Sequence, residues 1–403
     1  MKYLQALSLA ISLTPVSVLC LTGRPIGRAE DANPYIGKVA FANKVYAGKL
    51  QETVQYFVQA GDDLGAAQTR TVAKTPTFSW ISASDDVAGI KSLIADTLGA
   101  QEASSEPHIL QLVVYNLPNR DCSAGASAGE FDLEKDGLNK YKAFIDRIAE
   151  ELSTEDAKRI SFVVLIEPDS TGNLVTNMAL KSCAKAAPVH KEGIAYAIAK
   201  LQNPNIAVYL DGANGGWLGW DENLAPSAKL FADVLQDAKK FNPNAKARGV
   251  AINVSNYNQY ISAVREPFTE FSNSWDEYHY VNSLTPHLEA AGYPAHFIVD
   301  QARSGRGGIR TEWGQWCNVK NAGFGIRPTA DQTILNNPNV DAIVWVKPGG
   351  ESDGTSDRSS ARFDETCVSE VSHVPAPEAG SWFNEYVVNL VKNAEPPLEP
   401  SRD

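Results

Sequence analysis

The chain reads Ser161-Phe162-Val163-Val164-Leu165-Ile166-Glu167-Pro168-Asp169-Ser170 over residues 161–170. The unbroken apolar run from Phe162 to Ile166 is typical of a strand buried on both faces of a parallel sheet. Asp169 follows this run closely, so we expect its carboxyl group at the edge of an apolar interior.

Similar apolar, β-branched runs recur along the chain. Together with the first they lie at residues 77–82, 110–116, 161–167, 205–211, 248–254, 296–301 and 341–347. Between them lie stretches with apolar residues three or four positions apart, for example at residues 136–154, 190–202 and 226–240. This alternation of strand and helix predicts an α/β fold, a parallel β/α barrel rather than an open doubly wound sheet.

A polar or aromatic side chain stands at or just after the end of each predicted strand. In chain order these are Trp80, Asp121, Asp169, Asp211, Asn253 and Asp300, and then Lys347, Glu351 and Asp353. In a closed barrel the carboxyl ends of the strands meet on one rim, where barrel enzymes hold their catalytic groups. In an open sheet the same residues would spread along a line. The barrel therefore predicts a single cleft.

Composition limits the class of partner. The chain has 403 residues, a hydrophobic content of 43% and a formal net charge of −12, which describe a globular protein with an acidic surface. Such a surface repels phosphate backbones and anionic lipids, so we expect no nucleic acid and no membrane partner. A neutral polymer or a small molecule fits better.

The N-terminus has the pattern of a secretory signal. Lys2 precedes a short apolar core and then small residues near Cys20, so we predict a signal peptide at residues 1–22 and a single catalytic domain at 23–403. An N-terminal hydrophobic helix docked on the domain is the alternative. No later stretch is apolar enough to cross a bilayer. We expect a secreted, extracellular protein that acts as a monomer.

Five cysteines stand at positions 20, 122, 183, 317 and 367. Four remain if cleavage removes Cys20, and four allow three disulfide pairings in an oxidising compartment. We favour the pairs Cys122–Cys183 and Cys317–Cys367, because each joins two loops in one half of the chain. A zinc site is the alternative, but the sequence has no close cysteine pair and no histidines at ligand spacing. We expect no metal and no cofactor.

Asp169 is the candidate general acid. Cleavage of a glycosidic bond needs a proton for the leaving oxygen, and burial favours the protonated form of a carboxyl group. A second carboxylate nearby, such as Asp121, would raise the pKa of Asp169 further. The alternative is that Asp169 caps the following helix, since Asp-Ser after a strand is a common helix start.

Tryptophans in loops add a second signal. Trp217 and Trp220 lie among glycines directly after a predicted strand, and Trp313 and Trp316 lie beside Cys317. Flat aromatic rings suit the apolar faces of pyranose sugars, although any single tryptophan is more often a core anchor. Several on one rim, with Trp80, favour sugar-binding platforms.

These motifs together resemble the glycoside hydrolase family 6 cellulases, and among them the fungal cellobiohydrolase II type, here without a cellulose-binding module. The segments that carry the resemblance are residues 113–122, 166–170, 216–220, 316–318, 323–328 and 345–357. The resemblance implies a distorted seven-stranded β/α barrel whose loops enclose a tunnel or cleft. It also implies inverting hydrolysis of β-1,4-glucan and cello-oligosaccharides, and the same two disulfides.

The resemblance assigns roles residue by residue. Asp169 matches the proton donor, and Asp121 matches the residue that raises the pKa of that donor. Ser127 matches a mobile-loop serine that positions water, and Tyr115 matches the tyrosine that favours a distorted sugar ring. Asp353 matches the proposed base, which acts directly or through waters. Sugar-binding positions are matched by Trp80, Ser82, Asp211, Asn214, Trp217, Trp220, Asn253, Trp316, Lys347 and Glu351. Asn214 and Ser82 depart from the histidine and aspartate common in the family, so affinity or substrate choice is expected to differ.

Loop length bears on the mode of action. The segment from Trp345 to Cys367 has the length found in tunnel-forming members, which favours exo action from the non-reducing end with release of cellobiose. An open-cleft endoglucanase of the same family is the alternative.

A catalytically silent carbohydrate-binding protein is a rival from another class, but Asp121, Asp169 and Asp353 are all present. A metal-dependent sugar isomerase or hydrolase would need clustered metal ligands that the sequence does not show.

Overall fold

The computed structural model describes residues 32–401, and the signal peptide predicted at residues 1–22 lies outside this range. The chain from Pro34 onward forms one compact unit. Its strands are β1 (Val39–Ala40), β2 (Ser79–Ile81), β3 (His108–Val114), β4 (Ser161–Ile166), β5 (Ile206–Asp211), β6 (Gly249–Ile252), β7 (Phe297–Asp300) and β8 (Val340–Val344).

Helices connect the strands. The α-helices are α1 (Lys44–Gln59), α2 (Asp63–Ala73), α3 (Ile90–Ser104), α4 (Gly137–Glu151), α5 (Ser170–Thr176), α6 (Lys181–Lys200), α7 (Asp221–Phe241), α8 (Glu277–Ala291), α9 (Gln332–Leu335) and α10 (Asn384–Lys392). Short 3-10 turns are η2 (Ser84–Gly89), η3 (Leu133–Lys135), η4 (Ala157–Arg159), η5 (Pro267–Thr269) and η6 (Glu365–Val368).

The strands form one parallel sheet in the order β1-β3-β4-β5-β6-β7-β8, and β2 pairs with the end of β3. The sheet curls until its two ends approach each other. Between them the Phe78 amide donates a hydrogen bond of 3.1 Å to the Trp345 carbonyl, and the Trp80 indole donates one of 2.9 Å to the Val346 carbonyl. The α/β barrel predicted from sequence is confirmed, with a seam between β2 and β8.

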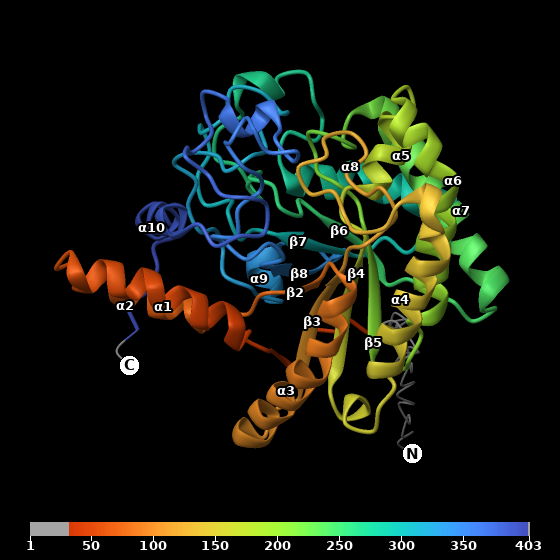
Figure 1. Ribbon diagram of the computed structural model, residues 1–403, viewed down its shortest axis with the longest axis horizontal. Helices are drawn as coiled ribbons and strands as arrows, with labels where there is room; N and C mark the ends of the chain where they lie inside the picture. The colour runs from red at the N-terminus through yellow and green to blue at the C-terminus, as the bar shows by residue number, and fades with distance from the viewer. Residues whose placement is uncertain (1–31, 402–403) are drawn as a thin grey trace, which may run out of the picture. The chain divides into compact units, whose positions relative to one another are not determined.

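Both faces of the sheet are buried, which explains the unbroken apolar run at 161–170. In β4, Val163 and Leu165 pack in the barrel interior with residues of all the strands from β3 to β8. Their neighbours Phe162 and Val164 face outward into a larger core under α3, α4, α6, α7 and α8 (Figure 1). Alternate residues therefore reach two different apolar environments, and neither face needs polar side chains.

A separate core lies beside the barrel. Helices α1, α2 and α10 pack together through Leu50, Phe57, Val72 and Leu390, and lie side by side in Figure 1. The Tyr46 hydroxyl of α1 donates a hydrogen bond of 2.9 Å to the Gly349 carbonyl. This core therefore supports the segment that follows β8.

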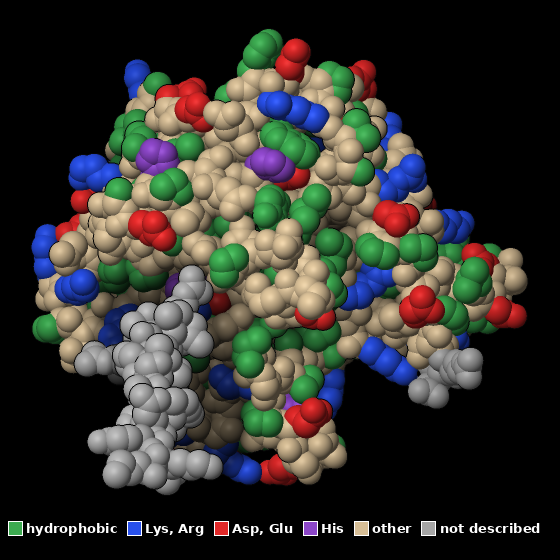
Figure 2. Space-filling view, turned by 180° about the vertical axis from the view of Figure 1, so that it is seen from behind, with side chains coloured by type: hydrophobic (Ala, Val, Ile, Leu, Met, Phe, Trp, Pro, Cys, Tyr) green, Lys and Arg blue, Asp and Glu red, His purple; other side chains and the backbone are tan. Residues whose placement is uncertain are grey.

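The seven predicted strands are all present, although β2, β6, β7 and β8 are at least two residues shorter than predicted and the two-residue β1 was not predicted. The helix predicted at 190–202 begins earlier, at Lys181, and includes Pro188. Within residues 32–401 no helix is long and apolar enough to cross a membrane. Figure 2 shows acidic and basic side chains interspersed over one face of the protein, so the negative net charge forms no single block there.

Candidate active site

A cavity of about 510 Å³ lies at the carboxyl ends of the strands. Most of the residues predicted for the site line it. These are Trp80, Ser82, Tyr115, Asp121, Ser127, Asp169, Asn214, Trp217, Trp316, Lys347, Glu351 and Asp353. The barrel therefore brings together side chains that are separated by up to about 270 residues in the sequence, as the strand-end pattern predicted.

Asp169 does not cap the helix that follows it. It occupies the position before α5 with φ of +67°, but its side chain makes no capping hydrogen bond. Its backbone amide donates a hydrogen bond of 3.0 Å to Oδ2 of Asp211. This left-handed backbone, unfavourable for a non-glycine residue, places the carboxyl group in the cavity instead.

The surroundings of Asp169 favour its protonated form. Burial, and next the negative charge of Asp121, raise the pKa of Asp169 to about 7, against an opposing effect of Lys347. A carboxyl group with such a pKa keeps its proton in acidic and near-neutral solution. It can therefore act as a general acid.

Asp211 lies beneath the site and does not line the cavity. Its side chain is 1% exposed and its Oδ2 accepts hydrogen bonds from the amides of Asp169 and Ala213. Burial, and next the charge of Asp169, hold the pKa of Asp211 well above its usual value. In the structure Asp211 supports the backbone of Asp169, and its direct contact with sugar stays a prediction.

Asp121, Ser127 and Tyr115 form one hydrogen-bonded group. Oδ2 of Asp121 accepts from the Ser127 amide at 2.8 Å and from its hydroxyl at 3.1 Å. The Ser127 and Tyr115 hydroxyl oxygens lie 3.1 Å apart. Burial raises the pKa of Asp121 against the hydrogen bonds from Ser127. The loop that carries Ser127 is thereby attached to a cavity carboxylate.

Asp353 has an environment opposite to that of Asp169. Its Oδ2 lies 2.7 Å from Nη1 of Arg303 and accepts hydrogen bonds from the Tyr257 hydroxyl and the Asn318 amide. Oδ1 lies 3.8 Å from Nζ of Lys347. Burial acts to raise the pKa of Asp353, but Arg303 and Lys347 outweigh it and hold that pKa below its usual value. Asp353 is therefore ionised where Asp169 is protonated.

Lys347 and Glu351 connect the cavity wall to its surroundings. Nζ of Lys347 lies 5.6 Å from the centre of the Trp80 ring, and burial lowers the pKa of Lys347. Glu351 pairs with Lys49 of α1 at 2.8 Å. Lys347 thus has a charged partner in Asp353 of the barrel rim, and Glu351 has one in helix α1.

The tryptophans expected to bind sugar differ in whether they line the cavity. Trp217 lies over Gly172 of α5 and donates a hydrogen bond of 2.7 Å to the Thr176 hydroxyl, and with Trp80, Trp316 and Trp313 it lines the cavity. Trp220 is half-buried, donates to the Gly216 carbonyl and lies outside the cavity lining. Its role as a sugar platform stays a prediction.

Asn253 lies below the cavity and does not line it. The side chain has no exposed surface, and its amide nitrogen donates to the carbonyls of Asn258 and Asp300 and to the Ser304 hydroxyl. Asn253 joins the ends of β6 and β7, and its contact with sugar hydroxyls stays a prediction.

Asn214 and Ser82, the two departures from the family pattern, both line the cavity. Oδ1 of Asn214 accepts a hydrogen bond from the Gly216 amide at 3.0 Å. Ser82 donates from its amide and its hydroxyl to Oδ2 of Asp86. Both side chains are thus held by their own loops.

Several residues important to the site were not predicted. Arg303 is 1% exposed and pairs with Asp353. Glu277 is buried, and its Oε1 accepts from the Gly215 amide and from the Asn258 side chain, under the loop that bears Trp217. Arg120 and Arg362 line the cavity. Arg303 follows closely on Asp300 at a strand end and Arg120 directly precedes Asp121, which are signals that could have been used. Glu277 and Arg362 are placed by long-range contacts.

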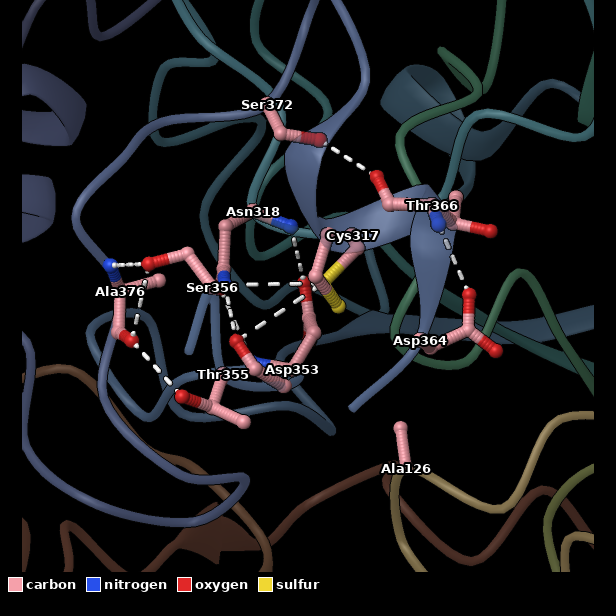
Figure 3. The surroundings of a disulfide bond; sticks show 12 residues. Ala126, Cys317, Asn318, Asp353, Thr355, Ser356, Asp364, Thr366, Ser372 and Ala376 are labelled. Carbon is pink, nitrogen blue, oxygen red and sulfur yellow. Dashed lines mark hydrogen bonds between the residues drawn. A yellow bond between two sulfur atoms is a disulfide. The ribbon is translucent and has the colours of Figure 1, made fainter. Parts of the chain in front are cut away.

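Two disulfides join Cys122 to Cys183 and Cys317 to Cys367, in the favoured pairing. Figure 3 shows the second beside Asn318, whose amide holds Asp353, and near Ala126 from the loop that carries Ser127. In the described part of the chain no group of three or more His, Cys, Asp or Glu side chains is placed to hold a metal ion.

Residues 35–394 match the family described as glycosyl hydrolases family 6. The chain belongs to this family. It is 46% identical over 366 residues to exoglucanase 3 of Agaricus bisporus, a match that covers 91% of this chain and 80% of the relative. A glycoside hydrolase family 6 enzyme from Coprinopsis cinerea, of known structure, is 62% identical with a TM-score of 0.90, over 92% of this chain and all of that one.

A further family 6 structure is cellobiohydrolase II of Humicola insolens in complex with glucose and cellotetraose. It is 43% identical with a TM-score of 0.85, over 91% of this chain and 100% of that one. The resemblance inferred from the motifs is thus confirmed, as are the α/β barrel and the class of enzyme. The chain is a glycoside hydrolase of family 6.

Proposed function

We propose that the protein is a secreted, inverting cellobiohydrolase that hydrolyses β-1,4-glucosidic bonds in cellulose and cello-oligosaccharides from the non-reducing end. The observation that carries the proposal is one cavity holding a protonated and an ionised carboxyl group, Asp169 and Asp353, among four tryptophans. Acid-base cleavage of a glycosidic bond needs such a pair, and the named relatives act on glucan chains.

In the proposed mechanism, Asp169 donates its proton to the leaving oxygen as the bond breaks. The negative charge of Asp121 disfavours the ionised form of Asp169, so it keeps the proton on Asp169 until the leaving oxygen takes it. Ser127 and Tyr115 lie beside Asp121, and we assign them the placement of water and the crowding of the sugar ring.

Asp353 serves as the base in this proposal. Three donors occupy Oδ2, so Oδ1 is the atom available to take a proton, directly or through a chain of waters. Lys347, near Oδ1, would stabilise the ionised form before proton transfer. Attack by water on the face opposite the leaving group inverts the anomeric carbon.

Extracellular action and exo cleavage are the finer parts of the proposal. The two disulfides support an oxidising compartment. Action as a monomer is part of the same proposal. The long segment after β8 supports an enclosed site and exo action.

The test is hydrolysis of cellotetraose by the natural protein and by Asp169→Asn, with the first product anomer followed by NMR. We expect the α-anomer, and a loss of about 10²–10⁴-fold in kcat for the variant. A β-anomer as first product, or retained turnover in the variant, would overturn the mechanism. A rapid fall in viscosity of soluble substituted cellulose would indicate the endoglucanase alternative.

A further inference from the structure

Two segments from opposite ends of the curled sheet meet beside the cavity. Residues 121–130 follow β3 and include Asp121 and Ser127, and residues 354–367 follow Asp353 after β8. Nε of Arg362 donates a hydrogen bond of 3.0 Å to the carbonyl of Ala126, 236 positions earlier in the sequence. Both segments contribute to the cavity lining, so this bond joins two parts of its wall.

Packing reinforces the contact. Ala126 is 1% exposed, and a methyl group added at Gly354 would lie 3.3 Å from its Cβ and only 2.6 Å from Sγ of Cys367. Gly354 therefore lies closely between Ala126 and the disulfide. The position of Ala126 is thus tied to the residue directly after Asp353.

A second arginine holds the next carbonyl of the same loop. Nε of Arg120 donates to the Ser127 carbonyl at 2.8 Å, and its Nη1 donates to the carbonyls of Ser82 and Tyr115. Consecutive carbonyls, at 126 and 127, are therefore fixed by cations from different segments. This fixes the peptide plane between them, and with it the Ser127 amide and hydroxyl that donate to Asp121.

The surroundings suit Arg362 to a contact that can be released. The Arg362 side chain keeps 37% of its surface exposed, and its Nη1 lies 3.9 Å from Oε2 of Glu378. Arg120 is more fully engaged, with three carbonyl partners and the Tyr115 ring 4.2 Å from its Cζ. The Arg362 side of the loop is thus the weaker attachment.

We propose that Arg362 is a positioning and specificity-determining residue. Its bond to Ala126 joins residues 121–130 to residues 354–367, so that the two segments form a closed wall over the cleavage point. The closed wall holds Ser127 against Asp121 and admits a glucan chain by its end. Without Arg362 the loop would lift from Gly354, and the cavity would accept internal stretches of chain. This inference rests on the proposed exo action on glucan.

The experiment compares the natural protein with Arg362→Ala, Arg362→Lys and the matched control Arg358→Ala. Arg358 lies in the same segment, is 65% exposed and pairs with Glu365, itself 75% exposed. For each protein, kcat and KM on cellotetraose are measured, together with the fall in viscosity of soluble carboxymethyl cellulose per reducing end formed.

Arg362→Ala is expected to lower kcat on cellotetraose about 10-fold and to raise the viscosity fall per bond cleaved several-fold, as expected for a lost positioning contact. Lysine at 362 should restore part of both values, and Arg358→Ala should match the natural protein. Amide hydrogen exchange should become faster at residues 123–128 in Arg362→Ala alone, which separates a lifted loop from general unfolding.

The two hypotheses fail in different ways. An inactive natural protein would overturn the proposed function. A natural protein with exo action whose Arg362→Ala variant has the same viscosity ratio and the same exchange at residues 123–128 would overturn the role of Arg362 alone. Faster exchange throughout the barrel in that variant would also count against a local contact.

Discussion

Nη1 of Arg303 lies 2.7 Å from Oδ2 of Asp353, and the two side chains are 1% and 6% exposed. The pair is therefore almost wholly removed from water. Two buried charges of this kind keep each other ionised, and removal of one leaves the other without compensation. Asp353 owes its low pKa to this partner more than to any other.

Arg303→Leu is expected to lower the free energy of unfolding by about 3–5 kcal/mol, because the buried carboxylate of Asp353 would keep its neutral donors but lose its nearest cation and retain the more distant Lys347. Urea unfolding at pH 7 measures this loss. The control is Arg306→Leu, since Arg306 lies in the same segment but makes an exposed hydrogen bond to Asn393. Equal stability of the two variants would contradict the importance of the buried pair.

Asp121→Asn is expected to move the alkaline limb of the pH–rate profile to lower pH. The charge of Asp121 raises the pKa of Asp169, and only the protonated form of Asp169 donates a proton. Activity is therefore present below the pKa of about 7 and lost as pH rises through it. Profiles of kcat/KM on cellotetraose measure the shift, and an unmoved limb would show that another group controls it.

Glu277→Gln is expected to make the protein less sensitive to alkaline pH. Burial raises the pKa of Glu277 from its ordinary 4.5 to about 8, so between these values the folded state binds the extra proton. Its contribution to stability is thus greatest below about pH 4.5 and falls by about 1.4 kcal/mol per pH unit up to about 8.

The side-chain amide introduced at position 277 in that variant would keep the Oε1 acceptor and remove the titration. Thermal unfolding between pH 5 and pH 9 should therefore show a shallower decline than in the natural protein. Glu289→Gln, in the same helix, is the control. Parallel curves for all three proteins would contradict the buried titration of Glu277.

Gly216→Ala is expected to displace Trp313 and raise KM for cello-oligosaccharides. A methyl group at this glycine would lie 1.8 Å from the Trp313 ring, too close for any small adjustment. The control is Gly99→Ala, where an added methyl group meets nothing within 4 Å. Unchanged KM with cellotetraose and longer oligomers would show that Trp313 is not needed for binding.

The sequence predicted the barrel well because each central strand is apolar on both faces. Val163 and Phe162 reach different cores, so the unbroken apolar run is itself informative. The two-residue β1 could not be predicted, because it exists only through its pairing with the start of β3. The length of a short strand such as β2 likewise depends on its partner.

The strand-end pattern located the cavity but could not orient every side chain. Asp169 follows β4 and Asp211 ends β5, yet one enters the cavity and the other lies under its backbone. Asn253 is turned inward in the same way. The sequence cannot tell these cases apart, because the difference depends on how adjacent strand ends fit together. Long-range partners such as Arg362 and Ala126 are beyond any local pattern.

Left-handed backbone is concentrated where the strands end. Asn119, Asp121, Glu167, Asp169, Ala213, Asn253 and Ser255 all have positive φ and follow β3, β4, β5 or β6. Each such non-glycine residue costs about 1–3 kcal/mol. Glycine would relieve the cost at Asp121 or Asp169 but would delete the carboxyl group. The strain at these two positions therefore cannot be removed without loss of the catalytic machinery, whereas the helical shell and the α1–α2–α10 core can gain stability with the site unchanged.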